Sequence, residues 1–279
     1  MLADVRHYEP AGIFVPQSTG AYPLLPFGSG CQTLSGRYMF SRFMAQPPAP
    51  ARVSVIIPAH NEANAIGLVL AEIPAGLVQE VVVVDNNSTD NTSAVARARG
   101  ATVLHEPRPG YGYACLAGMA HCYAAALKPL PDIIVFLDGD HSDYPEEMPL
   151  LLAPLLCGEA DLVIGSRALG QREKGSLLPQ QRFGNWLATR LLRLRYGGHF
   201  TDLGPFRAIR TAALQQLGMA DKTYGWTVEM QIKAARLGLR TTEVPVRYRR
   251  RIGTSKVSGT IRGTLGAGYK ILWTIYRYW

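Results

Sequence analysis

Cysteine is scarce in this sequence, and its spacing is informative. The four cysteines (Cys31, Cys115, Cys122 and Cys157) are too far apart for Cys-x-x-Cys pairing, and no histidine lies at zinc-site spacing from them. The pattern excludes a disulfide framework and a zinc knuckle. It indicates a reducing compartment, and we expect a cytoplasmic protein.

Long apolar runs and two common nucleotide-binding motifs are missing too. A membrane-spanning helix needs about 20 apolar residues, and the best candidate, 261–279, is interrupted by Arg262, Lys270 and Arg277. The N-terminus lacks the basic start and apolar core of a secretory signal. Neither a Walker motif nor GxGxxG is present, which excludes a P-loop NTPase and an ordinary dehydrogenase.

The composition is that of a globular protein, but the charge is unevenly placed. Hydrophobic residues make up 47% of the 279 residues and charged residues 18%. Of the 29 basic and 21 acidic residues, nine basic and one acidic lie in 240–279, which leaves 20 of each in the preceding chain (29 − 9 and 21 − 1). This asymmetry indicates an anionic partner near the C-terminus, either phosphate groups or an acidic membrane surface. A solvated basic face is the alternative.

The chain divides into three stretches. Residues 1–50 contain seven of the nineteen prolines and show no periodicity, so we expect a disordered extension there. Residues 51–258 alternate short apolar runs with helical segments, and 259–279 form a candidate amphipathic helix.

The alternation predicts an α/β fold, doubly wound, with a mostly parallel sheet and helices on both faces. Strands are expected at 53–57, 80–84, 101–104, 132–137, 161–164, 205–209 and 241–248. Helices are expected at 63–73, 89–99, 110–127, 146–156, 179–195, 211–217 and 225–237.

Polar clusters follow three of the expected strands. The first is Pro58-Ala59-His60-Asn61-Glu62, the second begins at Asp85, and the third is Asp138-Gly139-Asp140. Ligands bind at the carboxyl ends of strands in open α/β sheets, so we expect these clusters to converge on one site.

The Asp138-Gly139-Asp140 turn is a candidate metal site. Mg²⁺ and Mn²⁺ prefer carboxylate oxygens and leave positions open for substrate phosphates. Further acids crowd the same stretch, at Asp143, Glu146 and Glu147. Capping of the next helix is the structural alternative for some of these acids.

Two other segments suggest nucleotide binding. Asp85 could accept hydrogen bonds from a nucleobase or ribose, or simply form an Asx turn. Arg108 and Gly112 precede or open a helix in Glu106-Pro107-Arg108-Pro109-Gly110-Tyr111-Gly112, a plausible anion-binding loop.

In combination, IIPAHNE, VVVVDNNSTDNT, EPRPGYGYACLAG, FLDGDHSDYPEE and VIGSR resemble family-2 glycosyltransferases of the GT-A fold over about residues 52–258. The later segments TDLGPFRAIR, YGWTVE and RYRRRIGTSKVSG look like the branch that contains polyprenyl-phosphate mannose and glucose synthases. The resemblance implies a Rossmann-like GT-A domain over 51–258.

The resemblance also assigns roles to residues. It implies that Asp138 and Asp140 hold the metal that bridges the diphosphate, and that Arg251, Ser255 and Lys256 close over the phosphates. The expected nucleotide-sugar contacts are Pro58, His60, Glu62, Asp85, Arg108, Gly112, Asp138, Gly139, Arg167, Arg251, Ser255 and Lys256. Two departures stand out: His60 replaces a residue that is more often aromatic or aliphatic, and the membrane helices of many lipid-phosphate members are absent.

The chemistry follows from charge. A leaving diphosphate develops negative charge that a cation and basic side chains can stabilise. The candidate catalytic residues are Asp140, and Glu229 or Asp202 as a base if the acceptor is a hydroxyl. A phosphate acceptor is already an anion and needs no base. Glu229 has an alternative role at the N-terminus of a helix, where an acid favours the dipole.

Trp226 and Arg249 are the residues expected to contact the acceptor. Trp226 could stack on a sugar or pack in the core. The basic run around Arg249 could suggest nucleic acid, but beside sugar-nucleotide motifs it more economically serves phosphates, so we expect no nucleic-acid partner. The C-terminal helix could lie on an anionic membrane at its inner face, or dock on its own domain or on a dimer mate.

We therefore expect a glycosyltransferase that uses Mg²⁺ or Mn²⁺ and a UDP- or GDP-sugar, with a polyprenyl phosphate as the favoured acceptor and, through the family, inversion at the anomeric carbon. A hydroxyl acceptor and a catalytically silent sugar-nucleotide-binding protein are the alternatives. The sequence leaves the oligomeric state open.

Overall fold

The computed structural model describes residues 50–124, 129–197, 200–253 and 261–279. The expected disorder of 1–50, apart from its last residue, and the expected phosphate contacts Ser255 and Lys256 fall outside these ranges. The same holds for the expected helix end at 127. Residues Ala49–Trp279 form one compact unit.

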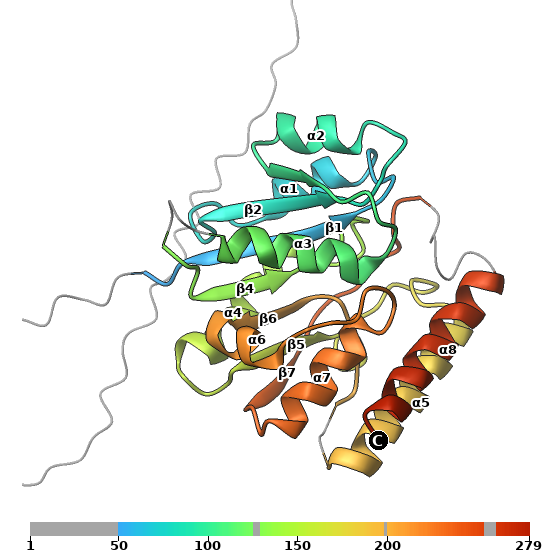
Figure 1. Ribbon diagram of the computed structural model, residues 1–279. Helices are drawn as coiled ribbons and strands as arrows, with labels where there is room; N and C mark the ends of the chain where they lie inside the picture. The colour runs from blue at the N-terminus through green and yellow to red at the C-terminus, as the bar shows by residue number, and fades with distance from the viewer. Residues whose placement is uncertain (1–49, 125–128, 198–199, 254–260) are drawn as a thin grey trace, which may run out of the picture. The chain divides into compact units, whose positions relative to one another are not determined.

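The centre of this unit is a seven-stranded sheet with the order β3-β2-β1-β4-β6-β5-β7 (Figure 1). Only β6 runs antiparallel to its neighbours, which are β4 and β5, so the expectation of a mostly parallel sheet is confirmed. The strands are β1 Val53–Ala59, β2 Glu80–Asp85, β3 Thr102–His105, β4 Ile133–Phe136, β5 Leu162–Ser166, β6 Arg207–Arg210 and β7 Thr241–Pro245.

Helices cover both faces of the sheet. The apolar cluster on one face joins the sheet to α3, α5, α6, α7 and α8, and the cluster on the other joins it to α1, α2 and α4. The helices are α1 Ile66–Glu72, α2 Thr92–Ala98, α3 Tyr111–Tyr123, α4 Met148–Leu156, α5 Pro179–Tyr196, α6 Thr211–Leu217, α7 Trp226–Arg236 and α8 Ile261–Arg277, with a 3₁₀ turn at Pro145–Glu147.

Strand alternation explains why both faces need cover. Successive side chains of a strand point to opposite faces. In β1, Ile56 enters one cluster while Val55 and Ile57 enter the other, and all three are fully buried. The near-continuous apolar runs of the sequence are thus typical of strands buried on both sides.

Every expected strand and helix is present, with ends that differ by a few residues, and local chemistry explains the differences. Helix α2 begins at Thr92 because Asp90 Oδ1 accepts the Thr92 backbone N–H at 3.0 Å and holds the preceding residues in a turn. Strand β7 ends at Pro245, which has no N–H for the sheet. Beyond it, Tyr248 makes isolated bridges to Asp143 and Arg172.

The C-terminal helix α8 packs on α5 and α7 (Figure 1). Its end is fixed by Arg195, which donates to the Trp279 carbonyl oxygen at 2.9 Å, and by Tyr196, whose hydroxyl donates to the Tyr278 carbonyl oxygen at 2.5 Å. Lys270 adds an ion pair with Asp221 at 3.0 Å. Among the helices of the described ranges, none has the length and apolar character needed to cross a bilayer.

Candidate active site

The site lies at the carboxyl ends of the parallel strands. Strands β1, β2, β3 and β4 are parallel, and β5 shares their direction because β6 is antiparallel to both β4 and β5. The sheet therefore brings the ends of β1, β2 and β4, which carry the three polar clusters, to one edge together with the end of β5.

An acidic centre follows β4. Asp138 Oδ1 and both carboxylate oxygens of Asp143 are buried without a hydrogen-bond partner. Burial and the nearby Asp140 raise the pKa of Asp138, and burial and Asp138 raise the pKa of Asp143 well above its ordinary value. Asp138 and Asp143 thus have buried carboxylate oxygens that lack a donor.

Asp140 has more partners than the other two acids. Its Oδ1 accepts the Ser142 backbone N–H at 2.9 Å and the Ser142 hydroxyl at 2.5 Å. Its Oδ2 forms an ion pair with Arg251, whose guanidinium also lies 3.7 Å from Glu62. Arg251 therefore connects the end of β1 with the end of β4, and its Nε remains buried without a partner.

A buried ion pair lies beside the acids. Arg167, directly after β5, donates to both carboxylate oxygens of Asp202, at 2.8 Å from Nε and 2.7 Å from Nη2, and its backbone N–H donates at 2.7 Å. Burial would raise the pKa of Asp202, but Arg167 outweighs it and the pKa is lowered. An Asp202 that stays charged in this pair is poorly suited to accept a proton as a base.

Asp85 ends β2 and organises the loop after it. Its Oδ1 accepts the Ser88 backbone N–H at 2.8 Å, and its Oδ2 accepts the Ser93 hydroxyl. Burial acts to raise the pKa of Asp85, but these hydrogen bonds prevail and lower it. The carboxylate is therefore charged and turned toward its own loop, a role that combines the Asx turn with the strand-end position the sequence predicted.

Asn86, the next residue, connects three loops and was not singled out from the sequence. Its side-chain amide donates to the carbonyl oxygens of Glu106 at 3.0 Å and Arg108 at 2.7 Å, and its Oδ1 accepts the Gly110 N–H at 2.8 Å. Its own carbonyl oxygen can only accept, so His60 Nδ1, 2.8 Å away, is the donor of this hydrogen bond. An Asn among several Asx residues carries no sequence signal of this role.

The loop between β3 and α3 is built around an internal ion pair. Arg108 donates to both carboxylate oxygens of Glu106 at 2.8 Å and lies over the Tyr113 ring. Arg108 lowers the pKa of Glu106 to about 2. The Arg108 side chain is 64% exposed, so it can still reach an anion.

Gly112 is required by close packing. A Cβ at Gly112 would lie 2.1 Å from the Asp221 carbonyl oxygen, and one at Gly110 would lie 2.4 Å from the Lys222 carbonyl oxygen. The start of α3 therefore presses against the backbone of 221–222, and Tyr113 N–H donates to the Lys222 carbonyl oxygen at 3.1 Å. Close packing against this backbone therefore explains why position 112, which the sequence placed in an anion-binding loop, is a glycine.

The two remaining expected residues at this edge of the sheet, Pro58 and Gly139, have structural positions in the backbone. Pro58 is buried in β1 opposite Val84, and Gly139 is buried with Ala59 and Ile57 within van der Waals distance of a Cβ placed on it. Both fix the path of the chain next to the acids.

Glu229 is held by the protein itself. It accepts the backbone N–H groups of Ala220 and Asp221, at 3.1 and 2.8 Å, and the Tyr278 hydroxyl at 2.9 Å. Lys233 lies 2.9 Å away, one helical turn on. The carboxylate joins the 220–221 loop to the C-terminal segment, which favours the structural role that the sequence left open.

The two residues expected at the acceptor, Trp226 and Arg249, have partners within the protein. Trp226 is 1% exposed and packs edge-on against Phe136, with 5.7 Å between ring centroids, because its face is needed by the core. Arg249 pairs with Glu72, at 2.5 Å to Oε2, and donates to the His141 carbonyl oxygen at 2.7 Å. Neither side chain presents a free surface to an acceptor.

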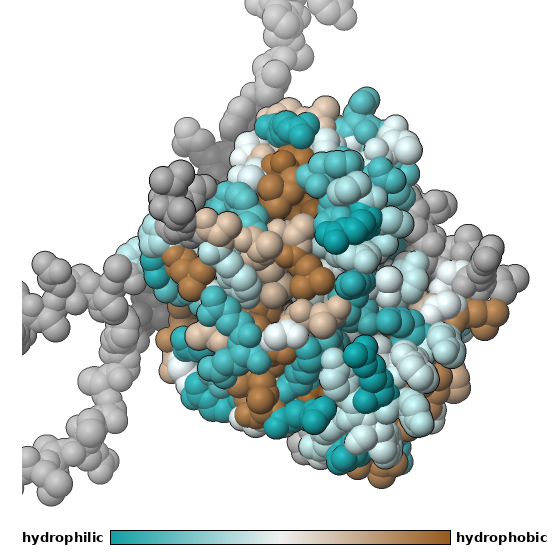
Figure 2. Space-filling view, in the orientation of Figure 1, coloured by the Kyte–Doolittle hydropathy of each residue, from teal (hydrophilic) through white to brown (hydrophobic). Residues whose placement is uncertain are grey.

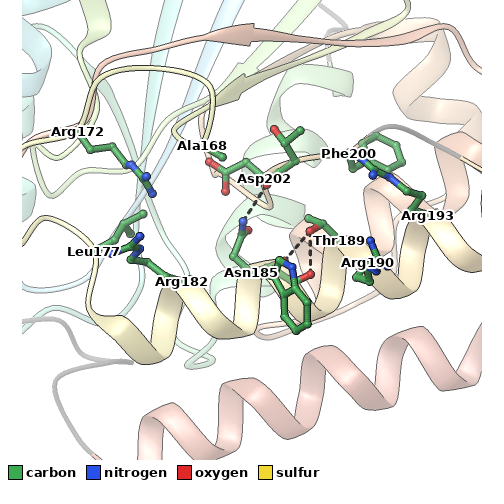
Figure 3. A pocket seen from close by; sticks show the side chains of 12 residues that line it. Ala168, Arg172, Leu177, Arg182, Asn185, Thr189, Arg190, Arg193, Phe200 and Asp202 are labelled. Atoms are coloured by element: carbon green, nitrogen blue, oxygen red, sulfur yellow. Dashed lines mark hydrogen bonds between the residues drawn. The ribbon is translucent and has the colours of Figure 1, made fainter.

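A pocket of about 300 Å³ lies next to Asp202 and is lined by arginines (Figure 3). Arg182, Arg190 and Arg193 come from α5, and Arg172 comes from the segment after β5. Asn185 joins α5 to the 201–203 segment beside the pocket. Its side-chain amide donates to the Thr201 carbonyl oxygen at 2.9 Å, and its Oδ1 accepts the Leu203 N–H at 2.8 Å. The sequence did not single out these arginines, although three of them recur at helical spacing.

The acidic centre fits a divalent cation. Asp138 Oδ1 has no hydrogen-bond partner and lies next to Asp140, and carboxylate oxygens are the ligands that Mg²⁺ and Mn²⁺ prefer. Across the described ranges, no three His, Cys, Asp or Glu side chains converge as a complete metal cage. The cation would thus complete its shell with water or phosphate oxygens, as Mg²⁺ does in phosphate-transfer sites.

Comparisons with known proteins point to one family. Residues 54–218 match the model of the family described as Glycosyl transferase family 2. An uncharacterized glycosyltransferase of Mycobacterium tuberculosis is 41% identical over 76% of this chain and 93% of its own length. The undecaprenyl-phosphate mannosyltransferase of Micrococcus luteus is 34% identical over 76% of this chain and 90% of its own length.

A solved structure is similar as well. It is glucosyl-3-phosphoglycerate synthase from Mycobacterium tuberculosis, in complex with Mn²⁺, UDP-glucose and phosphoglyceric acid. The TM-score is 0.65 at 28% sequence identity, and the match covers 82% of this chain and 80% of the other.

Proposed function

This chain belongs to glycosyltransferase family 2 and has the GT-A fold, as its motifs indicated, and from this premise we propose that it transfers a sugar from a nucleoside-diphosphate sugar to a polyprenyl phosphate. The observation that carries the acceptor assignment is the arginine-lined pocket beside Asp202.

The donor is proposed to lie across the strand ends. Asp85 and the loop that Asn86 holds would take the nucleoside, with Arg108 exposed toward the phosphates. Arg251 links Glu62 to Asp140 and would turn toward the diphosphate. A related structure that holds Mn²⁺ and UDP-glucose supports this reading.

A divalent cation would be held by Asp138 and Asp140. When bound, it would neutralise charge that develops on the leaving diphosphate. Arg251 is positively charged like the cation and lies at the Asp140 carboxylate, so it would also stabilise the negative charge of the leaving diphosphate. Ser255 and Lys256 remain proposed contacts to the phosphates, from a segment outside the described residues.

The acceptor phosphate is proposed to enter the pocket formed by Arg172, Arg182, Arg190 and Arg193. Guanidinium groups bind phosphate oxygens in bidentate fashion, and several of them in one pocket can hold a dianion. A phosphate nucleophile needs no general base. This agrees with the two base candidates, since Asp202 is locked in an ion pair and Glu229 is saturated by protein donors.

A small phosphorylated acceptor that reacts through a hydroxyl is the second candidate. It is favoured by the likeness to glucosyl-3-phosphoglycerate synthase, solved with phosphoglyceric acid. Such an acceptor would use the same arginines for its phosphate but would need a base for its hydroxyl.

Transfer of labelled sugar from UDP- and GDP-sugars, with Mg²⁺ or Mn²⁺ and either a short-chain polyprenyl phosphate or phosphoglycerate, tests the proposal. Arg182→Gln is expected to raise the KM for polyprenyl phosphate while the KM for donor changes little. Its matched control is Arg240→Gln, which removes an exposed arginine that pairs with Asp161. Transfer to phosphoglycerate alone would refute the lipid acceptor.

Removal of the acidic centre tests the metal. Asp140→Ala is expected to lower transfer by roughly 10²-fold or more. The matched control, Asp132→Ala, removes a half-exposed carboxylate paired with Arg52 at the other end of β4. Equal activity of the Asp140 and Asp132 variants would remove the metal assignment.

A further inference from the structure

An exposed, largely aromatic surface on α5 and α8 borders the arginine pocket at Trp186 and otherwise lies outside the site described above. Phe183, Trp186 and Leu194 on α5, and Tyr269, Trp273 and Tyr276 on α8, are each between 45% and 76% exposed. At the lower right of Figure 2, over the position of α8 in Figure 1, brown side chains reach the surface among pale and teal ones.

The spacing gathers these side chains into two stripes. Phe183, Trp186 and Leu194 recur at i, i+3 and i+11, and Tyr269, Trp273 and Tyr276 at i, i+4 and i+7. The Tyr269 and Trp273 rings stack with 6.4 Å between centroids, and Trp273 lies 5.6 Å from Tyr276. Because α8 packs on α5, the stripes belong to neighbouring helices of one body.

The charge of the two helices has one sign. Helix α5 carries four arginines and α8 carries Arg262, Lys270 and Arg277, and neither helix contains Asp or Glu. Tyr and Trp prefer the boundary between lipid headgroups and hydrocarbon, and basic residues beside them favour anionic lipids.

We propose that the aromatic stripes of α5 and α8 together form a docking surface for an anionic lipid bilayer. The choice of partner rests on the proposed lipid phosphate acceptor. Trp186 and Arg190 belong to α5 and also line the arginine pocket. Lipid headgroups that contact α5 would therefore lie next to that pocket.

A second copy of this chain fits the surface less well. A two-fold contact would place the basic helices of both copies against each other. Neither helix supplies an acid to pair with Arg190, Arg193 or Arg277, so the contact would bury like charges. An anionic surface supplies the missing counter-charge.

Vesicle binding tests the inference without nucleotide or acceptor. The full chain is mixed with vesicles of phosphatidylcholine alone, or of phosphatidylcholine and phosphatidylglycerol in equal amounts. We expect co-sedimentation with the anionic vesicles only, and a blue shift of tryptophan emission, because Trp186, Trp273 and Trp279 are about half exposed while Trp226 is buried.

Two substitutions test the surface, one on each helix. Leu194→Asp on α5 and Tyr276→Asp on α8 should each lower the partition coefficient about tenfold, since each removes exposed apolar surface and adds an anion. Leu156→Asp is the matched control, because Leu156 is 55% exposed at the end of α4. It should change binding less than about twofold.

The outcomes separate this inference from the proposed transferase activity. No binding of the wild type to anionic vesicles, with intact transfer to a short-chain, water-soluble polyprenyl phosphate, would overturn the docking surface alone. Unchanged binding of Leu194→Asp would overturn the part assigned to α5. A dimer in light scattering that Leu194→Asp dissociates, without vesicle binding, would assign the surface to a second copy instead.

Discussion

Asn86 offers a sharp test of how the donor side is held together. Its side chain is 8% exposed and makes three hydrogen bonds, to the carbonyl oxygens of Glu106 and Arg108 and from the Gly110 N–H. Asn86→Ala removes all three and leaves these backbone groups without that partner.

The expected loss follows from these bonds. Three hydrogen bonds at about 1 kcal/mol each suggest that Asn86→Ala lowers the free energy of unfolding by roughly 3 kcal/mol. A domain of this size loses about 2–4 °C in Tm per kcal/mol, so Tm should fall by about 6–12 °C. Because the loop that carries Arg108 is loosened, donor affinity should fall as well.

Thermal unfolding by circular dichroism measures the stability, and calorimetric titration with UDP- and GDP-sugars measures donor binding. Asn91→Ala is the control, since Asn91 is exposed and makes no side-chain cap bond at α2. Asn86→Asp keeps the acceptor for the Gly110 N–H but loses both donors, so its Tm should be lower than that of the wild type. Stability and donor affinity of Asn86→Ala equal to those of Asn91→Ala would refute the connecting role.

Three further outcomes follow from the contacts. Gly112→Ala should lower Tm much more than Gly184→Ala, because a Cβ at Gly112 would lie 2.1 Å from the Asp221 carbonyl oxygen while nothing lies within 4 Å at Gly184; equal melting curves would contradict the close packing. Glu229→Ala should release α8 and speed limited proteolysis there, with partial rescue by Glu229→Gln, since the carboxylate bonds the 220–221 loop and Tyr278; an unchanged cleavage rate would exclude this link. The lowered pKa of Asp202 means that its stabilisation is complete above about pH 3.9, its unfolded pKa, and is lost as the pH falls through the lower folded value. Acid unfolding of Asp202→Asn should therefore depend less on pH than that of the wild type in this range, and parallel curves would count against the pair.

The fold could be predicted from sequence because its signals are local. The apolar runs of β1, β2, β4 and β5 and the helical spacing between them depend on residues a few positions apart. The polar clusters after Ala59, Val84 and Leu137 lie at strand ends, and the parallel sheet brings such ends together whatever the details of packing. The position of the candidate site follows from that rule.

The roles of single side chains could not be predicted in the same way. Trp226 and Arg249 carry the chemistry of an acceptor contact, yet Phe136 and Glu72 engage them from elements far away in the chain. The sequence left two roles open for Glu229, and the distant hydroxyl of Tyr278 favours one of them.

The sequence by itself determined which elements form, which edge of the sheet carries the acids, and the family. Only the tertiary structure decided which polar groups are paired, that Asn86 connects three loops, and that the arginines of α5 face a pocket beside Asp202. The physical reason is the distance along the chain over which each property is set. Helical and strand periodicity depends on residues close in sequence, whereas burial and pairing depend on contacts between residues far apart in sequence.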